Sequence, residues 1–214
     1  MAEALAKAID ADVPLVRAGA LYHDIGKMVN PQCFIENENL GAHYHEGLSP
    51  RDSAREIINH VSDGLALAEK HNLPSVVKDF IVTHHGTSFT GYFYNKYLNA
   101  GGDPAFIEDF RYKGYPPSSR EQTVVMLCDS IEAASRTLKD NKPETFDAFV
   151  EKMVQTKTAE GQLGQSDLSL KELSAVKAML KSYLAQLYHD RVAYPEKKKT
   201  NNKNIHNENS EKSN

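Results

Sequence analysis

Apolar residues recur along this chain at helical spacing, and this pattern constrains the fold more than any other feature. Between Ala54 and Ala68 they recur every three or four residues, which is typical of one buried helix face. No stretch shows the sustained alternation of apolar and polar residues that a half-buried strand requires. The sequence therefore predicts an all-α protein, and its 214 residues suffice for one domain with a tail.

Residues that favour helix ends divide this pattern into separate helices. Ser49-Pro50 predicts a helix start, because serine caps an N-terminus and proline suits the first helical position. Ser118 with Glu121 and Ser169 with Glu172 have the spacing of a capping box. The predicted helices span residues 1–10, 14–26, 49–72, 74–86, 92–98, 118–134, 143–157 and 169–190.

Two stretches break the helical pattern. Residues 87–117 form a long aromatic- and glycine-rich connection. The last 20 residues hold six Asn and five Lys and almost nothing apolar, so they cannot offset the entropy of ordering. The sequence thus predicts one domain over residues 1–195 and a disordered polar tail over residues 196–214.

Composition excludes several classes of protein. With 29 acidic and 25 basic residues, the chain has a formal net charge of −4, which disfavours a nucleic acid polymer as partner. Its two cysteines cannot build a disulfide scaffold, and this favours a reducing compartment. We find neither a signal peptide nor an apolar run near the roughly 20 residues that span a bilayer. These features predict a soluble intracellular protein.

Histidines and aspartates interrupt the apolar faces of four predicted helical segments. His60 lies three residues after Ile57, and Asp129 lies four residues after Val125, so both face inward. A single buried histidine is more often structural, but an aspartate is costly to bury unless it is paired or binds a metal. The residues of this kind are His23, Asp24, His60, His84, His85 and Asp129.

Imidazole and carboxylate groups together suit zinc, iron and manganese. Neighbouring residues on a helix point about 100° apart, so a His-Asp pair is poorly placed to chelate one ion. The carboxylate can instead bridge two ions while the imidazole binds one of them. Two ions about 3.5–4 Å apart can hold a bridging hydroxide and stabilise an in-line phosphoryl displacement.

Three ordered motifs, His23-Asp24-Ile25-Gly26-Lys27, His84-His85-Gly86-Thr87 and residues 129–136, resemble the HD-domain metal-dependent phosphohydrolases. The finer resemblance is to the membrane-anchored seven-transmembrane-receptor HD branch, whose characterised members hydrolyse cyclic di-AMP. It covers residues 3–195. Further matching segments are 34–37, 48–50, 92–94, 110–112, 188–191 and 194–195.

This resemblance implies an HD-domain helical bundle with two bound divalent ions, manganese or iron ahead of zinc. The six histidines and aspartates would be the ligands, with Asp24 as the bridge. A hydroxide on the ions would open cyclic di-AMP to linear pApA, with Asp24 and Lys27 as catalytic residues. Expected partners are the cyclic dinucleotide, a membrane through a portion outside this chain, and a second copy in a homodimer. By this resemblance the chain would be the cytoplasmic domain of a membrane-anchored protein.

The family carries one more histidine ligand about thirty residues before the His-Asp pair. Because His23 stands 22 residues after Met1, that ligand would lie before this chain begins. We therefore expect one of the two ions to bind weakly and turnover to be slow.

Substrate contacts are expected at Lys27, Thr87, Tyr92, Tyr94 and Arg136. Thr87 is the weaker phosphate candidate, and the other four have a structural alternative: Lys27 can cap a helix, Arg136 can pair with Glu132, and the aromatic rings can pack on the core. Two alternative functions also stay open. One is another HD nucleotide phosphohydrolase, of the nucleotidase or dNTPase type, and the other is a catalytically impaired nucleotide-binding signalling module.

Overall fold

The computed structural model describes residues 1–34, 37 and 43–189, and in these ranges the regular structure is helical. The expected all-α fold is thereby confirmed, while the predicted tail over residues 196–214 lies outside the described residues. No helix in the described part of the chain combines the length and apolar character needed to cross a membrane. The α-helices are α1 (Ala2–Ala8), α2 (Val13–Tyr22), α4 (Pro50–Lys70), α5 (Ser75–Thr83), α6 (Gly91–Asn99), α7 (Arg120–Ser135), α8 (Pro143–Ala159) and α9 (Leu170–His189). Short 3-10 helices are η1 (Ile25–Met28), η2 (Pro31–Cys33) and η4 (Pro104–Phe110).

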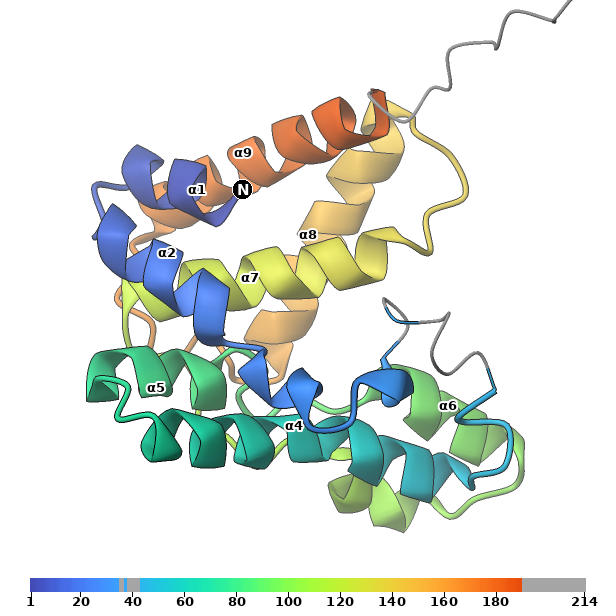
Figure 1. The fold of residues 1–214 in the computed structure, drawn as a ribbon. Coiled ribbons are helices and arrows are strands. Elements are labelled where there is room, and N and C mark those ends of the chain that lie inside the picture. Colours follow the sequence, from blue (N-terminus) through green and yellow to red (C-terminus); the bar gives the residue numbers. More distant parts are fainter. Residues whose placement is uncertain (35–36, 38–42, 190–214) are drawn as a thin grey trace, which may run out of the picture.

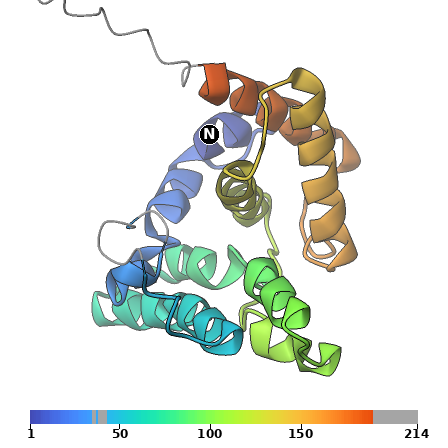
Figure 2. The same ribbon diagram turned by 90° about the vertical axis from the view of Figure 1, so that its right-hand side faces the viewer.

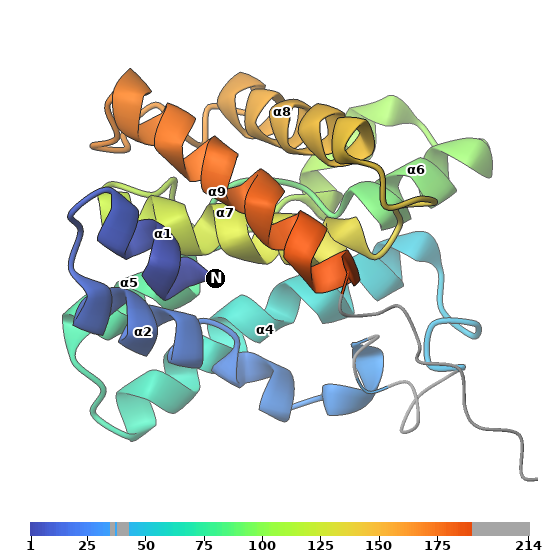
Figure 3. The same cartoon turned by 90° about the horizontal axis from the view of Figure 1, so that it is seen from above.

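Helix α7 is the centre of the bundle. Figure 2 shows it nearly end-on with the other helices around it, and α1, α2, α5, α8 and α9 all contact it. In Figure 3 α9 crosses over it from above. Six consecutive residues of α7, Thr123 to Cys128, are buried, as expected of a helix enclosed on all sides.

A smaller cluster lies below the main core, where α4 and α6 run side by side (Figure 1). Its buried residues are Ala54, Phe93 and Phe110, with Tyr94 and Tyr97 packed against them. The aromatic connection therefore supplies a second core, and this agrees with the packing alternative for several of its rings.

Two of the three predicted helix starts are confirmed. The hydroxyl of Ser49 accepts from the Asp52 amide, and Ser169 and Glu172 form the expected reciprocal pair. The third prediction, Ser118 with Glu121, is wrong by one residue. Helix α7 begins at Arg120 with Ser119 as its cap, and the Ser119 hydroxyl accepts from the Gln122 amide. Glu121 accepts from the Asp12 amide instead.

The second predicted helix, residues 14–26, ends earlier than expected. Helix α2 stops at Tyr22, and the apolar side chain of Leu21 beside this end is 69% exposed. The chain then continues as the 3-10 helix η1, which packs closely on α4. A Cβ at Gly26 would lie 1.8 Å from the carbonyl oxygen of His60. Gly26 therefore does not end a helix; its lack of a side chain lets the segment after Asp24 approach His60.

Candidate metal centre

Four separate segments bring the six predicted ligands together. His23 caps the C-terminus of α2 and Asp24 follows it, while His60 lies in the middle of α4. His84 caps the C-terminus of α5, His85 follows it, and Asp129 lies on α7. These elements meet because α2 and α5 both end beside α7, and η1 lies on α4.

The ligand atoms form two groups that share Asp24. In each group all the atoms lie within 4.8 Å of one another. Asp24 Oδ1 faces one group, at 3.4 Å from His60 Nε2 and 3.5 Å from His84 Nε2. Asp24 Oδ2 faces the other, at 3.3 Å from His23 Nε2. The groups are Asp24, His60, His84 and His85, which we call group A, and His23, Asp24 and Asp129, which we call group B.

Backbone carbonyls orient three of the four imidazoles. The Nδ1 atoms lie 3.0 Å from the Ala20 oxygen for His23, 2.6 Å from the Ile57 oxygen for His60 and 2.8 Å from the Ile81 oxygen for His84. A carbonyl can only accept, so each Nδ1 carries the proton. In that tautomer Nε2 of His60 and His84 presents a lone pair to the centre, as in metal-binding histidines, and Nε2 of His23 would do so once its second proton is displaced.

Asp24 Oδ1 is the observation that best fits a bound cation. This oxygen is buried, and nothing in the described structure donates a hydrogen bond to it. A buried carboxylate oxygen without a donor is costly, and a divalent ion would remove that cost. The imidazole and carboxylate donors around it match borderline divalent ions. The residues present therefore fit a metal centre.

The surroundings shift the pKa values of the histidines in opposite directions. Burial, with the neighbouring His84, lowers the pKa of His60 to about 4, and it lowers the pKa of His85 well below its usual range. Burial also acts to lower the pKa of His23, but Asp129 and Asp24 outweigh it and raise that pKa to about 10. At neutral pH His60 and His85 are thus neutral, whereas His23 holds a proton that an ion would have to displace.

The two aspartates are ionised. Burial acts to raise the pKa of Asp24, yet the interactions with His23 and His84 outweigh it and hold that pKa well below the usual range. The pKa of Asp129 is lowered against burial in the same way, with His23 as the largest opposing contribution. Both carboxylates are therefore ready to bind a cation.

A cleft of about 560 Å³ opens onto group B. Lys27 and Arg136 bring positive charge to it. The ammonium of Lys27 lies 2.7 Å from Asp24 Oδ2, and Arg136 bonds both carboxylate oxygens of Glu132, which is the pairing considered from the sequence. The apolar lining of the cleft comes from Met1, Ala2, Ala20, Val125, Cys128 and Ala133.

The other expected substrate residues do not line this cleft. The amide and hydroxyl of Thr87 both bond the side chain of Gln162. Tyr92 on α6 is 73% exposed, and the Tyr94 hydroxyl donates to the Pro104 carbonyl. Their contacts with substrate stay predictions.

The sequence analysis did not predict two of the side chains at the centre, Tyr112 and Lys157. The Tyr112 ring stacks on His85 with 4.1 Å between centroids and 23° between planes, yet its surroundings in the sequence do not separate it from eight other nearby aromatic residues. Lys157 is buried on α8, although lysine is usually exposed. A signal did exist for Lys157: it continues the apolar stripe of Phe146, Val150 and Val154 at helical spacing.

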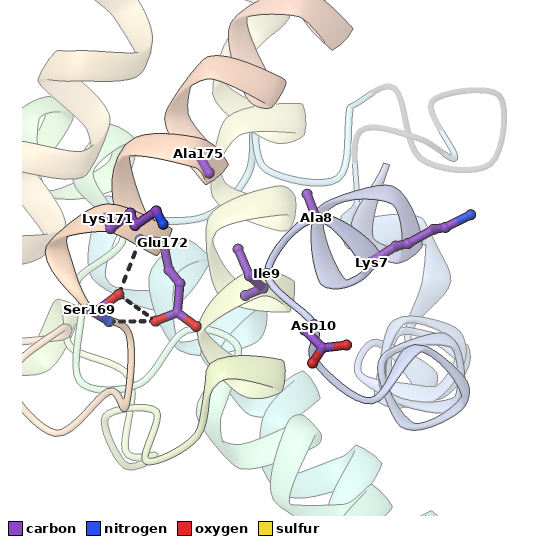
Figure 4. A pocket seen from close by; sticks show the side chains of 8 residues that line it. All are labelled: Lys7, Ala8, Ile9, Asp10, Ser169, Lys171, Glu172 and Ala175. Carbon is purple, nitrogen blue, oxygen red and sulfur yellow. Dashed lines mark hydrogen bonds between the residues drawn. The ribbon is translucent and has the colours of Figure 1, made fainter.

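A second cavity, of about 460 Å³, lies between the end of α1 and the start of α9 (Figure 4). Lys7, Asp10 and Lys171 line it, together with Glu172, which is hydrogen bonded to Ser169. None of the predicted site residues lies there, so the cleft beside group B is the candidate site.

Comparison with known proteins identifies relatives of this chain. The HD domain family model matches residues 1–134. An uncharacterized protein of Synechocystis is 42% identical over 200 residues, which are 91% of this chain and 25% of that protein. The cyclic-di-AMP phosphodiesterase PgpH of Bacillus subtilis is 37% identical over 196 residues, which are 92% of this chain and 27% of PgpH. The chain thus spans about a quarter of the length of these curated relatives.

Solved structures agree with these matches. The HD domain of Listeria monocytogenes PgpH has a TM-score of 0.79 at 31% identity, with 88% of each chain covered. The same domain in complex with cyclic-di-AMP has a TM-score of 0.82 at 31% identity, with 87% of each chain covered. The helical architecture is therefore shared with a solved HD domain.

Proposed function

This chain belongs to the HD domain family, and we propose that it is a metal-dependent phosphodiesterase that hydrolyses cyclic di-AMP to linear pApA. One observation carries the proposal: two groups of ligand atoms share the carboxylate of Asp24, whose two oxygens face different groups. The named activity of the PgpH relatives and the cyclic-di-AMP complex of the Listeria domain support the choice of substrate.

Two divalent ions, manganese or iron ahead of zinc, would be held by group A and group B. When bound, they would supply Lewis acidity at the phosphoryl group. Asp24 would hold both ions at once, and the remaining ligands would hold one each. Because none of these side chains is placed as a nucleophile, the attacking group would come from water.

The positive side chains of the cleft would hold the phosphate groups. Lys27 lies beside Asp24, next to where the scissile phosphate would sit, and Arg136 lies farther along the cleft wall. Lysine acts there as a point charge, whereas arginine can bond two phosphate oxygens. Thr87, Tyr92 and Tyr94 remain the proposed contacts for the rest of the substrate, with the tyrosine rings stacking on adenine.

The test is hydrolysis of cyclic di-AMP by the manganese-loaded chain, followed by chromatography of the products. We expect linear pApA to form, and Asp24→Asn to abolish the reaction. Nucleoside mono- and triphosphates in parallel reactions test the alternative HD hydrolases, since preferential release of phosphate from them would overturn the proposed substrate. Binding of cyclic di-AMP that needs no metal and gives no product would instead favour the signalling module.

Attachment to a membrane and formation of a homodimer are proposed for the whole protein on the same resemblance. Gel filtration with light scattering tests the second of these for this chain.

A further inference from the structure

We infer that α8 and the turn that follows it position the His84-His85 pair through two buried side chains, Lys157 on α8 and Gln162 in that turn, and that these residues set the affinity of group A for its ion. The inference rests on the proposed metal centre. It concerns residues that bind neither the ion nor the substrate and act through the turn that follows His85.

His85 needs external support more than the other histidines of the centre. His23, His60 and His84 each direct Nδ1 at a backbone carbonyl. The His85 imidazole makes no such hydrogen bond within the described residues, and its nearest charged partner, Asp129 Oδ2, lies 3.6 Å from Nδ1. The direction of this ring therefore depends on its backbone and on the face of Tyr112.

Gln162 holds the turn after His85. Its side chain is fully buried, and Oε1 accepts from the Thr87 amide at 3.0 Å while Nε2 donates to the Thr87 hydroxyl at 2.8 Å. Gly86 has a φ of 54°, and a Cβ there would lie 2.1 Å from Gln162 Oε1. The amide of Gln162 thus occupies the space above the glycine and fixes the turn.

Lys157 hydrogen bonds to Ser88, the residue after Thr87. It is 8% exposed, and its ammonium donates to the Ser88 hydroxyl at 2.8 Å. Burying a lysine for a neutral partner is costly, and burial lowers its pKa. Methionine would fill similar space without that cost, so packing alone does not account for lysine here.

The opposite side of the turn is held by the segment after η4. Arg111 Nη1 donates to the Thr87 carbonyl at 2.8 Å, and the Tyr112 amide donates to the Ser88 carbonyl at 2.8 Å. The turn after His85 is thereby fixed between this segment on one side and Lys157 and Gln162 on the other. Loss of the Lys157 and Gln162 contacts would let the turn, and the His85 ring with it, shift away from group A.

The test uses Gln162→Met and Lys157→Met. Gln155→Met and Lys152→Met, at exposed positions of α8, are the controls. Manganese binding is measured by calorimetry, and cobalt absorption spectra report the ligand geometry. We expect each test variant to weaken one ion by about tenfold and leave the other unchanged, since supporting partners of ligands typically contribute that much. The cobalt spectrum should change in the test variants only, and excess manganese should restore their turnover.

Unchanged affinity for both ions, and an unchanged cobalt spectrum, in folded Gln162→Met and Lys157→Met would overturn the inference. Should either variant fail to fold, Ser88→Ala removes the acceptor of Lys157 with a smaller change. Unchanged manganese affinity of Ser88→Ala would likewise overturn the inference. Absence of metal from the unaltered chain would instead refute the proposed function.

Discussion

At the residue scale, the two oxygens of Asp24 organise the centre. Oδ1 faces His60 and His84, and Oδ2 faces His23. The sequence revealed these residues because each places a polar group on or beside an apolar helix face. For Lys157 the sequence offers only the apolar stripe that it continues, which indicates burial. The contacts of Lys157 and Tyr112 at the centre come from segments that only the fold brings together.

Asp24→Asn should remove both ions, because it weakens the one ligand that the two groups share. Asp129→Asn should remove the ion of group B and leave that of group A. His71→Gln, at an exposed position after α4, is the control and should hold as much metal as the unaltered chain. Bound metal per chain, measured by mass spectrometry after dialysis, gives the answer, and one tightly held ion in Asp24→Asn would contradict the bridging role.

At the element scale, local signals placed most helices but not every boundary. Ser118 and Ser119 are adjacent, and each has an acidic or amide residue three positions later, so spacing alone cannot choose between them. The choice comes from the tertiary fold, where Glu121 accepts from the Asp12 amide. The early end of α2 has a similar origin, because η1 must lie against α4.

Gly26→Ala should destabilise the protein by about 1–3 kcal/mol or more, because the new methyl group meets the backbone of α4. It should also weaken metal binding, since Asp24 would move away from His60. Gly47→Ala is the matched control, because nothing lies within 4 Å of a Cβ there. Chemical denaturation measures the free energy of unfolding of the two variants. Equal stability of Gly26→Ala and Gly47→Ala would contradict the close packing of η1 on α4.

Glu172 makes the start of α9 sensitive to acid. Hydrogen bonds from Ser169, and then the ion pair with Arg120, lower the pKa of Glu172 from 4.5 to about 2. A lowered pKa in the folded state means that its stabilising contribution is complete above pH 4.5 and is lost as the pH falls toward 2.

Glu172→Gln keeps a capping oxygen but removes the charge, so it should lower the unfolding temperature at pH 7. The difference from the unaltered protein should shrink between pH 4.5 and pH 2. Unfolding followed by circular dichroism across this range measures it, and a difference independent of pH would show that the charge contributes nothing.

At the scale of the whole molecule, the centre joins α2, α4, α5 and α7. The all-α class and the positions of most helices were predictable, because apolar periodicity and capping residues are local properties. The enclosure of α7, and the second core formed by the aromatic connection, were not predictable from the sequence, because they depend on contacts between distant segments.

Ion binding should therefore stabilise the entire bundle. At an ion concentration one hundred times the dissociation constant, one site adds about 2.7 kcal/mol to the free energy of unfolding. The unfolding temperature should rise with manganese and fall again after chelation. Asp24→Asn is the control and should show no rise, whereas an unaltered protein insensitive to manganese would contradict the coupling.

Anomalous diffraction from crystals soaked in manganese tests the central claim most directly. Our account predicts two anomalous peaks in contact with Asp24, one bounded by His60, His84 and His85 and the other by His23 and Asp129. Ions bound elsewhere, or a centre without ions in which Asp24 pairs only with Lys27, would contradict it.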